Sequence, residues 1–169
     1  MVRFAQIRSI ASLALQLTIL GALIAAFFIR PQPVSGLSME PHISTGEYVL
    51  INTLAYRFGA PARGDIVAFH HDNPTPELFI KRVVAIAGDR VRIDRGALYV
   101  NGQRADEPYV RYPDDRSTPE SVVPSNAVYV LGDNRANSED SRAFGPVSDA
   151  DLQGKALAGI WPPATAGAL

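Results

Sequence analysis

The sequence contains no cysteine among its 169 residues and has no excess of positive charge. The absence of cysteine excludes a disulfide scaffold, a thiol nucleophile and any metal site built from thiolates. The 16 basic residues are balanced by 17 acidic ones. Because nucleic-acid binding requires clustered Lys and Arg, this balance argues against a nucleic-acid partner, and we expect none. The length predicts one folded domain rather than a large multidomain enzyme.

Histidine is also scarce, with only His42, His70 and His71 in the chain. A Ser-His-Asp relay would need one of them. His42 lies four residues from Ser38. His70 and His71 follow an apolar run, at a position where a solvated loop is expected. The spacing of the three matches no common metal site. We therefore expect neither a metal nor a cofactor.

The sequence has one long apolar run, from Ser9 to Ile29, which contains no charged residue. As a helix it would rise about 31 Å, which is enough to cross a bilayer core. A cleavable secretory signal would be shorter and would end in small residues, whereas this run ends in Phe27, Phe28 and Ile29. A buried core helix would carry a polar face. The run therefore predicts a retained transmembrane anchor.

The charges around this run predict its orientation. Arg3 and Arg8 precede it and Arg30 alone follows closely, which places the N-terminus in the cytoplasm. Residues 1–30 would then be a cytoplasmic stub and anchor in the cytoplasmic (inner) membrane, so that the phospholipid bilayer is itself a partner. Residues 31–169, with 13 basic and 17 acidic groups, would form an exported domain on the outer, periplasmic face, and we expect it to be monomeric.

The exported part has the pattern of a mostly β, antiparallel domain. Its prolines and glycines separate short apolar runs rich in Val, Ile, Tyr and Phe. Asn101-Gly102 predicts a hairpin turn, Ser148–Gln153 a short helical turn capped by Ser148, and the proline-rich stretch 103–124 an extended loop or small insert. The strands expected are Tyr48–Thr53, Asp65–His70, Leu78–Ala87, Arg90–Asp94, Ala97–Val100, Ala127–Leu131 and Ala156–Trp161.

The first chemically unusual segment is Ser35–Pro41, just beyond the anchor. Ser38 lies between apolar Leu37 and Met39, in a turn constrained by Gly36 and a proline. A hydroxyl in such a turn is exposed on a fixed backbone. By itself this serine is weak evidence, because most serines in loops are inert.

The second is Phe79–Val84, where Lys81 and Arg82 interrupt an apolar strand. Neighbouring strand residues point to opposite faces, so one of the two cations faces the apolar side. Burial disfavours an ammonium and could lower the pKa of Lys81 from about 10.4 toward 8. Such an amine can act as a general base. The alternative is that Lys81 extends to solvent along the sheet.

The third is Gly132–Arg142, which follows an apolar strand and combines charged side chains with asparagines and serines. A calcium loop is excluded, because Arg135 occupies its third position and glycine is missing from the sixth. Ion pairs could rigidify this segment, and a serine could orient the lysine amine. A solvated charge cluster is the alternative. The residues of interest are Asp133, Arg135, Ser138, Asp140 and Arg142.

Taken together, these segments resemble the bacterial type I signal peptidases, membrane-anchored serine proteases with a Ser/Lys dyad. The similarity runs from Ser9 to about Trp161 and follows the order of the family's motifs. After the anchor come Ser-Met-x-Pro, Gly-Asp-Ile-Val at 64–67, Lys-Arg-Val-Val with Gly88-Asp89, and Gly-Asp-Asn-Arg-x-x-Ser-x-Asp-Ser-Arg. The interval of 43 residues between Ser38 and Lys81 and the brief insert after Asn101 are similar to those of the smaller, single-anchor members.

The resemblance implies specific roles. Ser38 would attack the scissile carbonyl of a pre-protein, and Lys81 would take its proton and pass it to the leaving amine. Ser138 would hydrogen-bond Lys81, while Asp133, Arg135, Asp140 and Arg142 would hold the last motif in shape. The oxyanion would be bound by the backbone N–H of the nucleophile. Some members add a hydroxyl two residues earlier, where this chain has Gly36, so Ser35 or a second backbone N–H could substitute.

The resemblance also implies a substrate: signal peptides that end in small residues, bound as an added strand. Shallow pockets would be lined by Val34, Gly36, Met39, Ile43, Phe79 and Ile80. Three other readings stay open: a related peptidase dedicated to one secreted or conjugation substrate, a membrane-tethered β domain that binds signal peptides without cutting them, and a cytosolic self-cleaving regulator. The anchor argues against the last of these.

Overall fold

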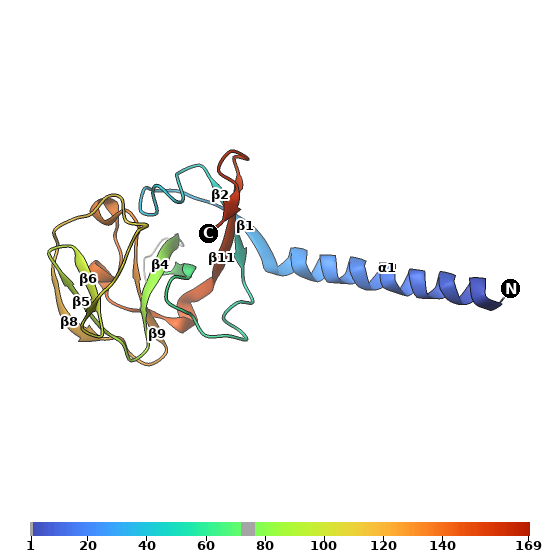
Figure 1. Ribbon diagram of the computed structural model, residues 1–169, viewed down its shortest axis with the longest axis horizontal. Helices are drawn as coiled ribbons and strands as arrows, with labels where there is room; N and C mark the ends of the chain where they lie inside the picture. The colour runs from blue at the N-terminus through green and yellow to red at the C-terminus, as the bar shows by residue number, and fades with distance from the viewer. Residues whose placement is uncertain (1, 72–76) are drawn as a thin grey trace.

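The computed structural model describes the backbone of residues 2–71 and 77–169, as one long helix attached to a β domain (Figure 1). Helix α1 is Val2–Phe28. Its stretch Ile10–Phe28 is long and apolar enough to cross a membrane, and none of it is buried against the domain. The predicted orientation depends on Arg3 and Arg8, whose side chains lie outside those described, and it stays a prediction.

The helix ends one residue earlier than the predicted span, because Ile29 begins strand β1 (Ile29–Pro33). This strand pairs antiparallel with β2 (Tyr48–Asn52). Thr53 donates from both its backbone N–H and its hydroxyl to the Phe28 carbonyl, each at 3.0 Å. The end of the apolar helix is therefore joined directly to the sheet, without a linker.

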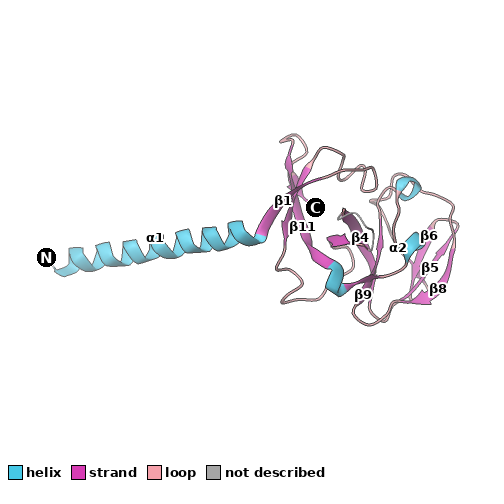
Figure 2. Ribbon diagram, turned by 180° about the vertical axis from the view of Figure 1, so that it is seen from behind, coloured by secondary structure: helices cyan, strands magenta, loops and turns pink. Residues whose placement is uncertain are grey.

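The domain consists of two antiparallel sheets, which confirms the predicted mostly β fold. The eight-stranded sheet has the order β1-β2-β11-β3-β4-β9-β10, with β12 beside β11, and the smaller sheet has the order β7-β6-β5-β8. The small sheet lies at the end of the domain away from α1 (Figures 1 and 2). The other strands are β3 (Ile66–His70), β4 (Leu78–Ile86), β5 (Arg90–Asp94), β6 (Ala97–Val100), β7 (Gln103–Arg104), β8 (Thr118–Val122), β9 (Ala127–Leu131), β10 (Val147–Ser148), β11 (Leu152–Trp161) and β12 (Gly167–Ala168).

The predicted strands are found, and most of their ends agree to within one residue. The exception is β11, which begins four residues before the predicted start at Ala156. Its first half pairs with β3 and its second half with β2. Gly154 permits the change of partner, because a Cβ there would lie 2.4 Å from the Asn52 carbonyl oxygen. Polar residues in this first half hid the strand from the hydrophobic pattern.

The stretch 103–124 is more ordered than the predicted loop, since it contains β7 and β8. The Asn101-Gly102 turn is confirmed, with φ of 53° and 79° at its two residues. β8 is an exposed edge strand that pairs only with β5, and an edge is where a strand containing Pro119 is tolerated. The predicted helical turn is the 3-10 helix Asp149–Asp151, capped by Ser148.

The core is divided so that one part supports the loop after β1. Val34, Met39 and Ile43 of that loop pack with Ile66 and Ile80 of the large sheet. Met39 and Ile43 are almost completely buried. Because these side chains hold the loop at both sides of Ser38, hydrophobic packing fixes the position of the serine.

Candidate active site

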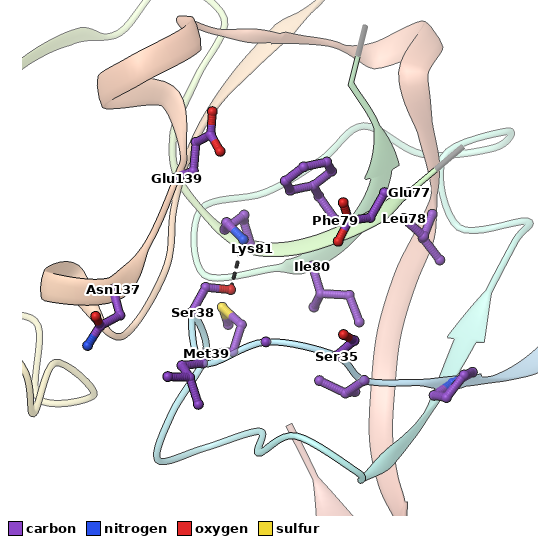
Figure 3. Close-up of a pocket in the computed structure, with 14 residues that line it drawn as sticks. Ser35, Ser38, Met39, Glu77, Leu78, Phe79, Ile80, Lys81, Asn137 and Glu139 are labelled. Carbon is purple, nitrogen blue, oxygen red and sulfur yellow. Dashed lines mark hydrogen bonds between the residues drawn. The ribbon is translucent and has the colours of Figure 1, made fainter. Parts of the chain in front are cut away.

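A cleft of about 190 Å³ lies where the loop after β1 meets the start of β4 (Figure 3). Ser38 and Lys81 lie side by side in it. The residues that line it are Pro33, Val34, Ser35, Gly36, Leu37, Ser38, Met39, Glu77, Leu78, Phe79, Ile80, Lys81, Asn137 and Glu139.

Ser38 is held by backbone contacts on both sides. The Ser38 carbonyl accepts a hydrogen bond from the Asn134 backbone N–H at 2.9 Å. Gly36 adopts a φ of 103°, which favours glycine, and its carbonyl accepts from the Thr45 hydroxyl at 2.8 Å. Gly132 has no room for a side chain, because a Cβ would lie 2.5 Å from the Ser38 carbonyl oxygen. The first and third sequence segments are therefore in direct contact.

Lys81 is buried, with 4% of its surface exposed, which excludes the alternative that it extends to solvent. Its Nζ lies 2.8 Å from Ser38 Oγ and 5.3 Å from the centre of the Phe79 ring. Burial lowers the pKa of Lys81 to about 8, against the opposing effect of the carboxylates of Asp140 and of two glutamates at the cleft. The amine is thus partly neutral near physiological pH.

Arg82 points away from the cleft, as strand alternation requires. It forms a two-point ion pair with Asp133, at 2.8 and 2.7 Å. Burial opposes the charge on Arg82, but the bond to Asp133 outweighs it and raises the pKa of Arg82. Asp133 was expected to hold the last motif together. Instead it ties that motif to β4.

The three histidines take other positions. His42 Nδ1 lies 3.5 Å from Asp133 Oδ2, and His70 Nδ1 lies 3.2 Å from the Glu77 carbonyl. His71 stacks on Phe144 with ring centres 4.2 Å apart. Among the described hydrogen bonds, those of Ser38 Oγ involve Lys81 and none of the histidines.

Asp140 is the centre of the third segment and is fully buried. It binds Arg142 through Nε and Nη2, both at 2.7 Å, and accepts from the Gly132 N–H at 3.0 Å. Burial opposes the ionisation of Asp140, but these donors outweigh it and hold the pKa of Asp140 below its ordinary value. The predicted Asp–Arg pairing within this segment is confirmed for this pair.

One expectation for the segment is corrected by the geometry, and another is extended. The Ser138 hydroxyl donates to Asp140 Oδ2 at 2.6 Å rather than binding Lys81, because a carboxylate is a stronger acceptor than an amine. Arg135 was expected to act within the motif. It binds the Gly132 carbonyl at 3.0 Å, which lies within the motif, and also pairs with Glu107 outside it, at 3.1 and 2.5 Å.

The predicted pocket residues line the cleft with one exception. Ile43 is fully buried in the core and lies beneath the cleft rather than in it. Glu77 and Leu78, which sequence reasoning missed, precede Phe79 in the chain. Leu78 is the first residue of the predicted strand and could have been included with Phe79, whereas Glu77 lies just before that strand. Asn137 and Glu139 gave no signal beyond their place in the third segment. The remaining additions are Pro33, Ser35 and Leu37.

Comparison with known proteins agrees with this site. Residues 7–161 match the family described as signal peptidase, peptidase S26. Signal peptidase IB of Staphylococcus aureus strain Mu50 is 33% identical over 90% of this chain and 88% of its own length. Signal peptidase I of Leptolyngbya laminosa is 34% identical over 82% of this chain and 72% of its own.

A solved structure is similar as well. The crystal structure of a signal peptidase I from Enterococcus faecalis V583 superposes with a TM-score of 0.50 and 32% identity, and covers 57% of this chain and 97% of its own. Family, relatives and fold agree with one another. The chain belongs to the type I signal peptidase family, whose members are serine peptidases that cleave signal peptides.

Proposed function

We propose that Ser38 is the nucleophile of this signal peptidase and that Lys81 is its general base. One observation carries the proposal: a lysine amine whose pKa is lowered to about 8 lies 2.8 Å from a serine hydroxyl at the floor of the cleft. A buried amine and a hydroxyl in direct contact satisfy the geometric condition for proton transfer. Packing alone does not require a lysine at this position.

The reaction begins with the neutral form of Lys81. Its lone pair accepts the Ser38 proton as Oγ attacks the scissile carbonyl, and the resulting ammonium then protonates the leaving amine. A water molecule deprotonated by the same amine releases the acyl group from Ser38. Because burial lowers the pKa of Lys81 to about 8, the neutral form is available at a pH near 8.

The developing oxyanion would be bound by the backbone N–H of Ser38. Gly36 offers no hydroxyl, and Ser35 lines the cleft beside it. A second donor from this loop is expected, because loss of one oxyanion donor costs about 3–4 kcal/mol in other enzymes.

The small cleft supports cleavage after small residues. Val34, Met39 and Ile80 are buried side chains with little freedom to move aside. An extended signal peptide would pair with the chain near Ser38 and Lys81 and place small side chains against them.

Helix α1 supports anchoring in a membrane, and the charges of Arg3 and Arg8 before it favour the cytoplasmic membrane with the domain on the outer face. The helix is apolar, exposed, and joined directly to β1. A bilayer around α1 would therefore hold the cleft at a fixed distance from the membrane surface, where the apolar helix of a signal peptide ends.

The test is cleavage of a model pre-protein by the full chain in detergent. Ser38→Ala and Lys81→Ala should each abolish cleavage while the domain stays folded by circular dichroism. Lys155→Ala is the matched control, because Lys155 pairs with Asp65 away from the cleft. Retained turnover in either dyad variant would refute the proposal.

A further inference from the structure

The stretch Glu107–Arg116 contacts the third segment outside the cleft, and we call it the clamp. Its side chains meet the arginines that lie behind Ser38 and Lys81. Glu107 pairs with Arg135 at 3.1 and 2.5 Å. Tyr109 lies over the Arg82 guanidinium at 4.3 Å. None of the clamp residues lines the cleft that holds Ser38.

Asp114 contacts the arginine that binds Asp140. Its Oδ2 accepts from Arg142 Nη1 at 2.6 Å, and its side chain is 11% exposed. Arg142 is 2% exposed and binds Asp140 through its other nitrogens. The Arg142 guanidinium is therefore bound by one carboxylate from the clamp and one from the third segment.

Arg116 also binds the third segment, through backbone carbonyls of that segment. Besides pairing with Asp114, its Nη2 donates to the Arg135 carbonyl at 2.6 Å and lies 3.4 Å from the Ser138 carbonyl oxygen. A clamp residue is thus bonded on either side of the turn that carries the Ser138 hydroxyl.

The clamp is itself held by the small sheet. The Gly96 N–H donates to the Arg116 carbonyl at 2.9 Å. A Cβ on Gly96 would lie 1.9 Å from the Asp114 carbonyl oxygen, so the approach is possible only for glycine. Contacts with the β5–β6 hairpin therefore fix the position of the Asp114 backbone.

We propose that Asp114 is a positioning residue for signal-peptide hydrolysis. It fixes Arg142, which fixes Asp140, which in turn holds Ser138 and the Gly132 N–H against the Ser38 loop. This inference rests on the proposed roles of Ser38 and Lys81.

The expected consequence is a selective effect on the chemical step. The carboxylates that act on the Lys81 amine are Asp140, Glu139 and Glu77, and the amine also contacts Ser38 and Phe79. Asp114 is absent from this set and from the cleft lining, so it acts on the dyad through Arg142 and Asp140. A shift of Asp140 changes the alignment of the dyad but leaves the substrate-binding surface in place.

The test compares Asp114→Asn with Asp115→Asn in the full chain, using a model pre-protein in detergent. Both variants remove one negative charge, and Asp115 is exposed. Asp114→Asn should lower kcat about tenfold with KM within about twofold of the parent value, whereas Asp115→Asn should change neither. Arg116→Gln, which removes a half-exposed side chain, should lower kcat in the same way if Asp114→Asn does not fold.

Two results would overturn the inference. Asp114→Asn could unfold at a lower temperature and yet match Asp115→Asn in kcat per folded molecule, which would make Asp114 purely structural. Alternatively, KM could rise at constant kcat, which would make it a substrate contact. Failure of the dyad itself would be seen separately, as activity retained in Lys81→Ala.

Discussion

Arg82 and Asp133 form a two-point ion pair on one face of β4, while the neighbouring Lys81 contacts Ser38 on the other face. Asp133 is fully buried and the Arg82 side chain is 13% exposed. The pair joins β4, which carries Lys81, directly to the third segment. Stability and the geometry of the dyad are therefore coupled at this point.

Arg82→Met should destabilise the domain by about 3 kcal/mol, because it leaves the Asp133 carboxylate buried without its ion-pair partner. Urea unfolding of the full chain, followed by tryptophan fluorescence, measures this loss. Arg92→Met is the matched control, since Arg92 pairs with a half-exposed aspartate on the surface of the small sheet. An equal loss in the two variants would contradict the role given to the Arg82–Asp133 pair.

The cleavage rate should rise with pH through a midpoint near 8. Lys81 must be neutral to accept the Ser38 proton, burial lowers its pKa to about 8, and the neutral fraction grows as pH increases through that value. A profile of kcat/KM against pH from 6 to 10 measures the midpoint. A rate independent of pH over this range would contradict a lysine base.

Glu139→Gln should move that midpoint to lower pH, because the Glu139 carboxylate stabilises the Lys81 ammonium and raises its pKa. The shift expected for one partly screened charge is about half a pH unit. Glu120→Gln removes the same charge from β8 of the small sheet and should leave the midpoint unchanged. A shift to higher pH in Glu139→Gln would contradict this electrostatic account.

The sequence was sufficient for the parts of the site that lie on regular strands. Lys81 interrupts an apolar run, and period-two alternation correctly assigned it and Arg82 to opposite faces. The apolar patterns of β5, β6 and β9 are short and strong, and their ends were predicted to the residue. In these cases local pattern and tertiary burial agree.

The sequence was insufficient where a contact depends on the choice of partner. Ser138 has Asp140 two residues away, and composition alone cannot say whether its hydroxyl binds that carboxylate or Lys81. Glu107 pairs with Arg135 across 28 positions, with no pattern in the intervening chain to indicate it. Ile43 is apolar, as a pocket residue would be, but it is buried in the core and does not line the cleft.

Gly132→Ala should impair both folding and catalysis. A Cβ at this position would lie 2.3 Å from Ser138 Oγ and 2.5 Å from the Ser38 carbonyl oxygen, so the two loops must separate. Overpacking of this kind costs about 1–3 kcal/mol, and a displacement near 1 Å costs about a hundredfold in rate. Gly167→Ala, which meets no atom within 4 Å, is the control. Parent-like kcat in Gly132→Ala would show that the loops tolerate separation.

Ile80→Ala should broaden the choice of residue before the cut. Ile80 lines the cleft and is 8% exposed, so its truncation widens the cleft at the expense of about 2–4 kcal/mol of stability. The ratio of kcat/KM for a substrate with Val at that position to one with Ala should rise about tenfold. Ile43→Ala removes the same atoms from the same core cluster but outside the cleft. It should therefore lower stability without changing the ratio, and an equal change of ratio in both variants would show that specificity follows general loosening of the core rather than the shape of the cleft.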